Sequence, residues 1–332
     1  MHVGLMFSHR NPPQFAVPWP RIYAETLEQV TFAEQLGFDS VFSTEHHFTE
    51  DGYAPSLMPI EAAWAARTSR VKLGSFVLLL CMQNPLRLAE DAATVDIISD
   101  GRLILGMGLG YRDEEFAGFG VPKDRSGRIM DEALEIIVRA WTEDDFSFRG
   151  RHFQYEHVTL SPRPVQQPRP QIWVGQAGSP GVRRVAQWGL EGFCGAPNAE
   201  VYQHYLAKCQ EYGTEPNAQA QTLVFGHVQE DAEKAWAEAE PYATHVHTWY
   251  RTWRRGVGDA RSFTATPRDD FVIGDPSHWI SRLERTIEAQ SGGVRPNHLI
   301  VQLQLAGMPH DMAMRSMELF AGKVMPHFQT KE

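Results

Sequence analysis

Phe38-Asp39-Ser40-Val41-Phe42 is followed directly by Ser43-Thr44-Glu45-His46-His47-Phe48. The first segment is a short apolar run after a helix-like segment and a glycine, a pattern typical of a buried strand in a parallel sheet. We therefore expect Glu45, His46 and His47 at the carboxyl end of a strand, where α/β proteins carry functional residues. Because successive side chains of an extended chain point to opposite sides, His46 and His47 are not expected to share one metal ion.

Strands and helices alternate on both sides of this stretch. We predict eight strands, each followed by a helix, at residues 3–7, 38–43, 71–79, 102–106, 171–175, 192–194, 222–228 and 298–303. Eight alternations without a shorter repeat or a domain boundary predict α/β class and a single (β/α)8 TIM barrel over residues 1–332. Loop insertions, including a small hairpin at 145–158, are expected at its carboxyl face. A doubly wound sheet with a cap domain is the alternative.

The composition narrows the function classes. The net charge is −10 without a basic block, so neither nucleic acid nor an anionic membrane is an expected partner. Residues 1–7 lack a basic lead before a long apolar segment, and the best apolar run, Phe76 to Cys81, is strand-sized, so we expect no signal peptide and no membrane span. The three cysteines lie far apart, as expected for reduced thiols in a cytoplasmic protein.

Polar residues follow most of the predicted strands and should meet at the barrel mouth. No second carboxylate is expected to face Glu45 from the other strand ends, which argues against a glycosidase. His245 and His247 are two residues apart on a predicted helix, so they do not share a face. With no other cluster of His and Asp, we expect no metal site.

Two glycine-rich segments are also expected at the mouth. Gly106-Met107-Gly108-Leu109-Gly110-Tyr111 does not fit the dinucleotide-binding fingerprint, because Tyr111 replaces the third glycine and no helix opens directly after it. Gly175-Gln176-Ala177-Gly178-Ser179-Pro180-Gly181 joins a strand to a helix. Ser179 suits the N-cap and Pro180 the first turn, so this helix start is either an anion pocket or an ordinary capped helix.

Four motifs carry a family resemblance. They are Ser43-Thr44-Glu45-His46-His47-Phe48-Thr49-Glu50-Asp51-Gly52, Asn84-Pro85-Leu86-Arg87-Leu88-Ala89-Glu90-Asp91, Asp100-Gly101-Arg102 and Gly108-Leu109-Gly110-Tyr111. The chain resembles the bacterial luciferase-like, flavin-dependent monooxygenases over nearly its whole length. The resemblance implies a barrel that uses reduced FMN, supplied by a separate NAD(P)H:flavin reductase, and molecular oxygen. It also implies a flavin hydroperoxide that oxygenates a small organic substrate.

The resemblance also implies roles for individual residues. His46 matches the active-site histidine, Glu45 a residue beside the flavin, and Phe76-Val77 a peptide, often cis, that supports the isoalloxazine ring. The residues expected to bind the cofactor are Glu45, Ser75, Phe76, Val77, Leu109, Gly110, Tyr111, Arg128, Gln176, Ala177, Gly178 and Ser179. True luciferases carry a reactive cysteine in place of Gly108 and a phosphate-binding arginine in place of Leu109. Light emission is therefore not expected, and phosphate affinity should depend on Arg128 and Ser179.

Alternatives and further expectations remain at this stage. A deazaflavin-dependent oxidoreductase shares the barrel, and a flavin-binding protein without turnover is the alternative from another class.

The residues from Tyr250 to Ile273 lack periodicity and are predicted to form a mobile lid. The predicted helices at 56–67 and 86–98 carry more apolar surface than one face needs, which together with the resemblance predicts a homodimer. The sequence does not identify the substrate or the type of oxygenation.

Overall fold

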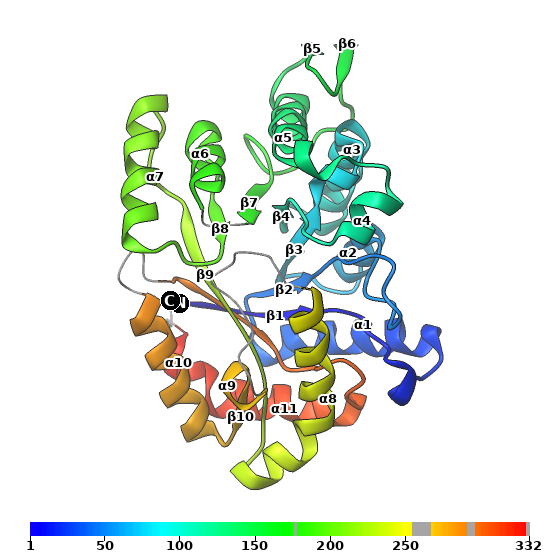
Figure 1. Cartoon of the computed structure of the whole chain (residues 1–332), viewed down its shortest axis with the longest axis vertical. Coiled ribbons are helices and arrows are strands. Elements are labelled where there is room, and N and C mark those ends of the chain that lie inside the picture. The colour runs from blue at the N-terminus through cyan, green and yellow to red at the C-terminus, as the bar shows by residue number, and fades with distance from the viewer. Residues whose placement is uncertain (176–177, 254–266, 291–295, 330–332) are drawn as a thin grey trace.

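Eight parallel strands form a closed barrel in the computed structural model, which describes residues 1–175, 178–253, 267–290 and 296–329 (Figure 1). Around the barrel the strands follow the chain: β1 (His2–Phe7), β2 (Ser40–Ser43), β3 (Lys72–Leu79), β4 (Leu103–Gly108), β7 (Gln171–Gly175), β8 (Gly192–Cys194), β9 (Gln219–Val228) and β11 (His298–Gln302). β9 pairs with β8 and with β11, and β11 pairs with β1, which closes the ring. The predicted (β/α)8 barrel is confirmed.

Helices cover the outside of this ring. The long ones are α1 (Trp19–Leu36), α2 (Leu57–Ala65), α3 (Pro85–Ser99), α5 (Ser126–Thr142), α6 (Ser179–Trp188), α7 (Ala199–Tyr212), α8 (Ala232–Trp253), α10 (Pro276–Gln290) and α11 (His310–Lys323). Local chemistry sets several helix ends. Gly37 adopts a φ of 91° and ends α1, while the Asn84 side chain accepts a hydrogen bond from the Arg87 amide at the start of α3.

The core has two layers because alternate residues of each strand face opposite ways. Met6, Phe42, Phe76, Ile104, Trp173 and Ile300 form one buried cluster that fills the barrel. Their strand neighbours, such as Leu5, Val41 and Leu105, belong to a larger cluster together with the helices. The strands therefore form a packed scaffold, and polar chemistry is left to the loops at their carboxyl ends.

The structure adds elements where the sequence pattern loosens. The expected long loop from Met107 to Gly127 contains α4 (Asp113–Gly118) and the 3-10 turn η3 (Lys123–Arg125). The expected hairpin is confirmed as β5 (Phe146–Arg149) and β6 (Gln154–Val158). Helix α8 continues to Trp253, and α9 (Pro267–Asp270) and β10 (Val272–Gly274) also fall within the region predicted to be irregular. Residues 254–266 lie outside the described residues, so the lid remains a prediction.

Three further short helical turns complete the described chain. They are η1 (Pro13–Phe15), η2 (Leu80–Met82) and α12 (Met325–Phe328). Among the described residues, no helix is both long enough and apolar enough to cross a membrane.

Candidate active site

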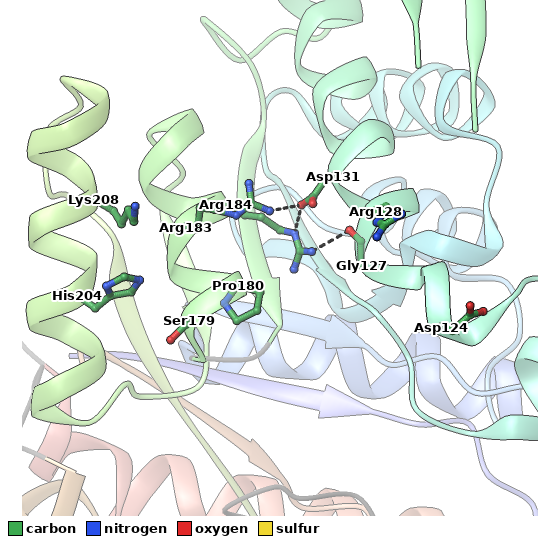
Figure 2. Close-up of a pocket in the computed structure, with 10 residues that line it drawn as sticks. All are labelled: Asp124, Gly127, Arg128, Asp131, Ser179, Pro180, Arg183, Arg184, His204 and Lys208. Carbon is green, nitrogen blue, oxygen red and sulfur yellow. Dashed lines mark hydrogen bonds and ion pairs between the residues drawn. The ribbon is translucent and has the colours of Figure 1, made fainter. Parts of the chain in front are cut away.

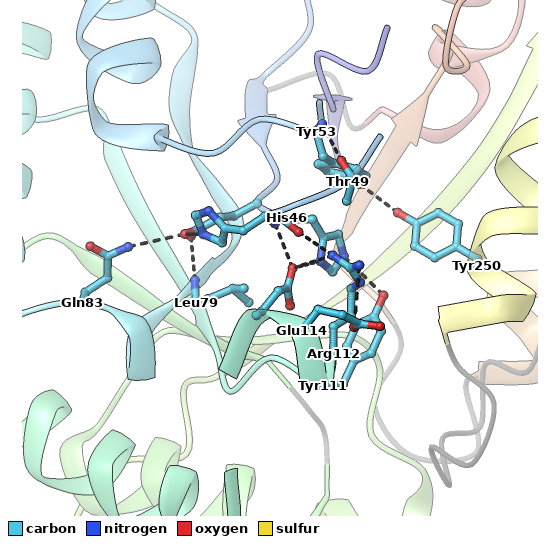
Figure 3. A network of polar contacts seen from close by, with 12 residues as sticks. His46, Thr49, Tyr53, Leu79, Gln83, Tyr111, Arg112, Glu114 and Tyr250 are labelled. Carbon is cyan, nitrogen blue, oxygen red and sulfur yellow. Dashed lines mark hydrogen bonds and ion pairs between the residues drawn. The ribbon is translucent and has the colours of Figure 1, made fainter. Parts of the chain in front are cut away.

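His46 lies three residues beyond the end of β2 and is almost fully buried. Its Nδ1 is 2.8 Å from Glu115 Oε1, and its Nε2 is 3.2 Å from the Tyr111 hydroxyl (Figure 3). Burial lowers the pKa of His46, although Glu115 opposes this shift. We therefore assign a neutral imidazole that donates its Nδ1 hydrogen to Glu115 and accepts from Tyr111 at Nε2.

Glu115 comes from α4, which the sequence interpretation treated as loop. Its Oε1 also accepts hydrogen bonds from the His47 amide, at 2.9 Å, and from Arg112 Nη1, at 3.4 Å. Burial would raise the pKa of Glu115, but the hydrogen bonds from His46 and His47 and the charge of Arg112 hold this pKa below its usual value. An ionised Glu115 fixes the tautomer of His46, because a carboxylate that accepts from one ring nitrogen keeps the hydrogen on that nitrogen.

His47 is held by a different carboxylate, as the alternation of side chains predicted. Its Nε2 is 2.6 Å from Glu45 Oε1, and the Leu79 amide donates to Glu45 Oε2 at 2.7 Å. Glu45 thus links the loop after β2 to the end of β3. The carboxylate expected beside the flavin is engaged with protein groups in this structure.

The Phe76-Val77 peptide is cis, as the resemblance implied. The chain is tightly packed around it: a Cβ added at Gly108 would lie 2.6 Å from Val77 Cγ2. Gly108 therefore has no room for the cysteine that true luciferases carry. Ser75, immediately before this peptide, is fully buried and donates to the Gly106 carbonyl at 2.8 Å. Its hydroxyl hydrogen is used between strands, so the cofactor contact expected for Ser75 remains a prediction.

A hollow of about 490 Å³ lies among α5, α6 and α7 (Figure 2). Its lining residues are Asp124, Gly127, Arg128, Asp131, Ser179, Pro180, Arg183, Arg184, His204 and Lys208. Four Arg or Lys side chains against two Asp leave a net charge of two positive, without counting His204. The hollow includes the first turn of α6, where backbone amides are unpaired. The structure thus brings Arg128 and Ser179 together in a basic pocket suited to a phosphate.

Ser179 does not cap α6, contrary to the sequence prediction. Gly178 is the N-cap, and Ser179 and Pro180 occupy the first turn. A Cβ at Gly178 would meet no atom within 4 Å, so the approach to this helix end is open. Gln176 and Ala177 lie outside the described residues.

Leu109, Gly110 and Tyr111 follow β4 directly, between the Phe76-Val77 peptide and His46. Gly110 adopts a φ of 79°, a conformation that favours glycine. This turn directs the chain so that the Tyr111 hydroxyl reaches His46 Nε2. Leu109 is half-buried against the core.

Four charged residues of the site were missed by sequence reasoning. Glu61, Glu115, Arg10 and Arg112 are all buried. Glu61 approaches Glu45 from helix α2 and not from a strand end, and the charge of Glu45 contributes to its raised pKa. A signal existed for Glu61, which occupies the apolar stripe of α2 four residues after Leu57. Glu115 had a weaker signal, since it directly precedes the buried Phe116. No group of three or more metal-ligating side chains occurs among the described residues.

Comparison with known proteins places these features in a family. The model of the luciferase-like monooxygenase family matches residues 1–293. Protein y4vJ of Sinorhizobium fredii is 27% identical over 341 residues, which cover 93% of this chain and 92% of that protein. The oxygenase component of the flavin-dependent trigonelline monooxygenase of Acinetobacter baylyi is 26% identical over 249 residues, 70% of this chain and 68% of that protein.

Two further similarities are to an F420-dependent enzyme and to a monooxygenase of known structure. The F420-dependent glucose-6-phosphate dehydrogenase of Amycolatopsis mediterranei is 32% identical over 201 residues, 58% of this chain and 59% of the enzyme. Among solved structures, monooxygenase RslO1 from Streptomyces bottropensis superposes with a TM-score of 0.85 at 26% identity, covering 99% of this chain and 100% of that one.

Proposed function

The chain belongs to the luciferase-like monooxygenase family, and from that premise we propose that it uses reduced FMN and molecular oxygen to oxygenate a small organic substrate. The observation that carries the proposal is His46, which is buried, neutral and hydrogen-bonded to Glu115 and Tyr111 at the carboxyl ends of the strands. The site also includes the cis peptide Phe76-Val77 and a basic pocket. An oxidoreductase with a bound flavin needs no protein nucleophile or metal.

The described residues fit a flavin mononucleotide. Arg128 and the first turn of α6 would hold its phosphate, since the pocket carries a net positive charge and an open helix start. The Phe76-Val77 peptide and the turn from Leu109 to Tyr111 would support its ring. When bound, reduced flavin supplies the electrons and activates oxygen.

The chain's own residues would manage protons and water. His46 Nε2 is the unprotonated ring nitrogen and accepts from Tyr111, so it is the atom at which His46 can take a proton from the substrate or return one. The Tyr111 hydroxyl, 3.2 Å away, can exchange that hydrogen bond with a reacting group. Glu115 keeps the tautomer fixed through the transfer. The buried aromatic rings of Tyr53 and Tyr250 would help to exclude water from the site.

The source of the reduced flavin and the identity of the cofactor are supported by different relatives. The relative from Acinetobacter baylyi is described as an oxygenase component, which supports delivery of reduced flavin by another protein. The second candidate is a deazaflavin-dependent oxidoreductase, which the similarity to the F420-dependent dehydrogenase favours.

The test is a screen under ¹⁸O₂. The protein is supplied with FMN, a flavin reductase and NADH, and a library of small organic compounds is followed by mass spectrometry. We expect one class of compound to gain a single ¹⁸O atom only when both protein and reductase are present. Oxidation without label incorporation, or oxidation that requires the deazaflavin, would overturn the proposal.

A further inference from the structure

The last turns of α8 pack on the loop that carries His46, although α8 lies far downstream in the sequence. The ring of Trp253 is 5.1 Å from the ring of His46, centroid to centroid. One turn earlier, the Tyr250 hydroxyl is 2.8 Å from the Tyr53 hydroxyl (Figure 3). The roles proposed above involve only Tyr250 of α8, so the contacts of Trp253 need an explanation of their own.

Two buried guanidinium groups meet the indole of Trp253. Arg112 Cζ lies 4.6 Å and Arg10 Cζ 5.4 Å from the ring centroid. The two side chains are only 6% and 1% exposed. Such cation–π contacts are stronger when they are desolvated than at exposed sites. Arg112 also donates to Glu115, so a chain of direct contacts runs from Trp253 through Arg112 and Glu115 to His46.

A second set of contacts fixes Arg10 and α8 relative to each other. Arg10 Nε donates to Asp51 Oδ2 at 2.6 Å, and His245 Nε2 lies 3.1 Å from the same oxygen. Gln14 Nε2 donates to His245 Nδ1 at 2.9 Å, and Arg10 Nη2 lies 3.4 Å from His245 Nε2. Asp51 is fully buried. Because His245 lies two turns before Trp253 on α8, this clamp of Arg10, Asp51 and His245 sets where Trp253 lies.

We propose that Trp253 is a positioning residue for His46: it holds Arg10 and Arg112 beside the imidazole and keeps water away from it, and the clamp of Arg10, Asp51 and His245 holds Trp253 in place. The proposal deepens the proposed function, in which His46 moves protons. The geometry that carries it does not depend on any cofactor.

The electrostatics of the site agree with this geometry. Burial is the largest influence that lowers the pKa of His46, and the charges of Arg112 and Arg10 act in the same direction. Glu115 is the opposing group, while Tyr111 and Tyr53 face the ring from the loops after β4 and β2. Removing the indole would admit water and screen both guanidinium charges. Both changes raise the pKa of His46 toward its usual value of 6.5.

The test is the NMR titration of His46 in Trp253→Leu, using ¹⁵N-labelled histidine and no cofactor. The signal is assigned by its loss in His46→Gln, since the chain has 14 histidines. We expect the titration midpoint to rise by about one pH unit, a tenfold change in proton affinity. Trp253→Phe, which keeps an aromatic face for the guanidiniums, should shift it less.

Trp236→Leu is the matched control. Trp236 lies on the same helix, nine residues before His245, and also carries an arginine over its ring, with Arg268 Cζ at 4.3 Å. It should leave the titration of His46 unchanged. Should Trp253→Leu fail to fold, Asp51→Asn tests the same path, because it releases both Arg10 and His245 and should shift the midpoint in the same direction.

An unchanged His46 midpoint in Trp253→Leu and Asp51→Asn, or an equal shift in Trp236→Leu, would overturn the proposal. Because the titration is recorded without flavin, a failed oxygenation screen would leave this result intact. If the protein does oxygenate a substrate, Trp253→Leu should also move the acid limb of the rate profile upward in pH, with the affinity for FMN unchanged.

Discussion

At the scale of single residues, the site depends on a neutral His46, whose single ring proton lies on Nδ1. Its Nδ1 hydrogen bond to Glu115 orients the ring, and burial keeps it neutral near pH 7. His47 differs, since its ring is held by Glu45 and its amide by Glu115. We therefore propose separate functions for the two adjacent histidines, the first in chemistry and the second in holding the loop.

Replacing His46 by Ala should lower turnover by roughly 10²–10⁴, the usual contribution of a positioned acid–base group, while FMN still binds. Steady-state oxygen uptake measures turnover, and equilibrium dialysis measures FMN binding. His47→Ala is the matched comparison and should act mainly through lower thermal stability. Turnover that is unchanged in His46→Ala would remove His46 from the chemistry.

Glu61 is a buried titratable residue whose effect on the free energy of unfolding can be measured. Burial, reinforced by the charge of Glu45, raises its pKa to about 8, while the hydrogen bond from Ser43 opposes the rise. A carboxyl with a raised folded-state pKa stays protonated in the folded chain and ionises in the unfolded chain. The free energy of unfolding therefore falls as pH rises from the unfolded pKa of about 4.5 through the folded value of about 8.

Glu61→Gln should remove this dependence, because the amide has the same shape and no proton to lose. At pH 7 the gain in stability should be at most about 3 kcal/mol. Urea unfolding at pH 5 and pH 8 measures it, with the exposed Glu50→Gln as control. A variant that is less stable than the wild type at pH 8 would show that Glu61 is ionised in the fold.

At the scale of elements, the pocket among α5, α6 and α7 supplies the test of phosphate binding. Arg128→Ala should weaken the binding of FMN much more than the binding of riboflavin, because only FMN carries the phosphate dianion. Fluorescence titration of both flavins measures the two dissociation constants. Arg125→Ala, an exposed arginine outside the pocket, is the control. Equal weakening of both flavins would show that Arg128 contacts another part of the ligand.

The elements themselves were largely predictable from sequence, and the side-chain pairings were not. The apolar run before His46 predicted a buried strand correctly, because the hydrophobic pattern of the sequence agrees there with the burial in the fold. Helix α4 was missed because it is only six residues long, too short for an apolar period. Its Glu115 nevertheless orients His46 from far along the chain, and no local pattern reports such a pairing. The same holds for Arg10 with Asp51 and for Trp253 with both arginines.

At the scale of the whole molecule, one face retains exposed apolar surface. Ala63 and Ala66 on α2 are exposed, and Ile97 and Ile98 on α3 are 38% and 46% exposed. The loop between Asn11 and Pro20 is a segment of the same chain that could cover α2. Its Phe15 instead contacts Tyr242 of α8, with ring centroids 4.7 Å apart. The predicted homodimer on α2 and α3 therefore remains the proposal for this face.

Ala63→Arg should shift the protein toward monomer, since a buried guanidinium in a close helix contact lacks a partner. Sedimentation velocity at micromolar concentration measures the oligomeric state. Ala237→Arg, at an exposed alanine of α8, is the control and should behave as the wild type. A monomeric wild type, or an unchanged dimer in Ala63→Arg, would contradict the proposal.

The assignment of the cofactor is the central claim for the molecule as a whole, and an anaerobic titration tests it most directly. The protein is titrated with reduced FMN and, separately, with the reduced deazaflavin coenzyme, and the dissociation constants are compared. We expect reduced FMN to bind at least about ten times more tightly, a difference of about 1.4 kcal/mol. Tighter binding of the deazaflavin, or no binding of either, would contradict the assignment of this barrel as an FMN-dependent monooxygenase.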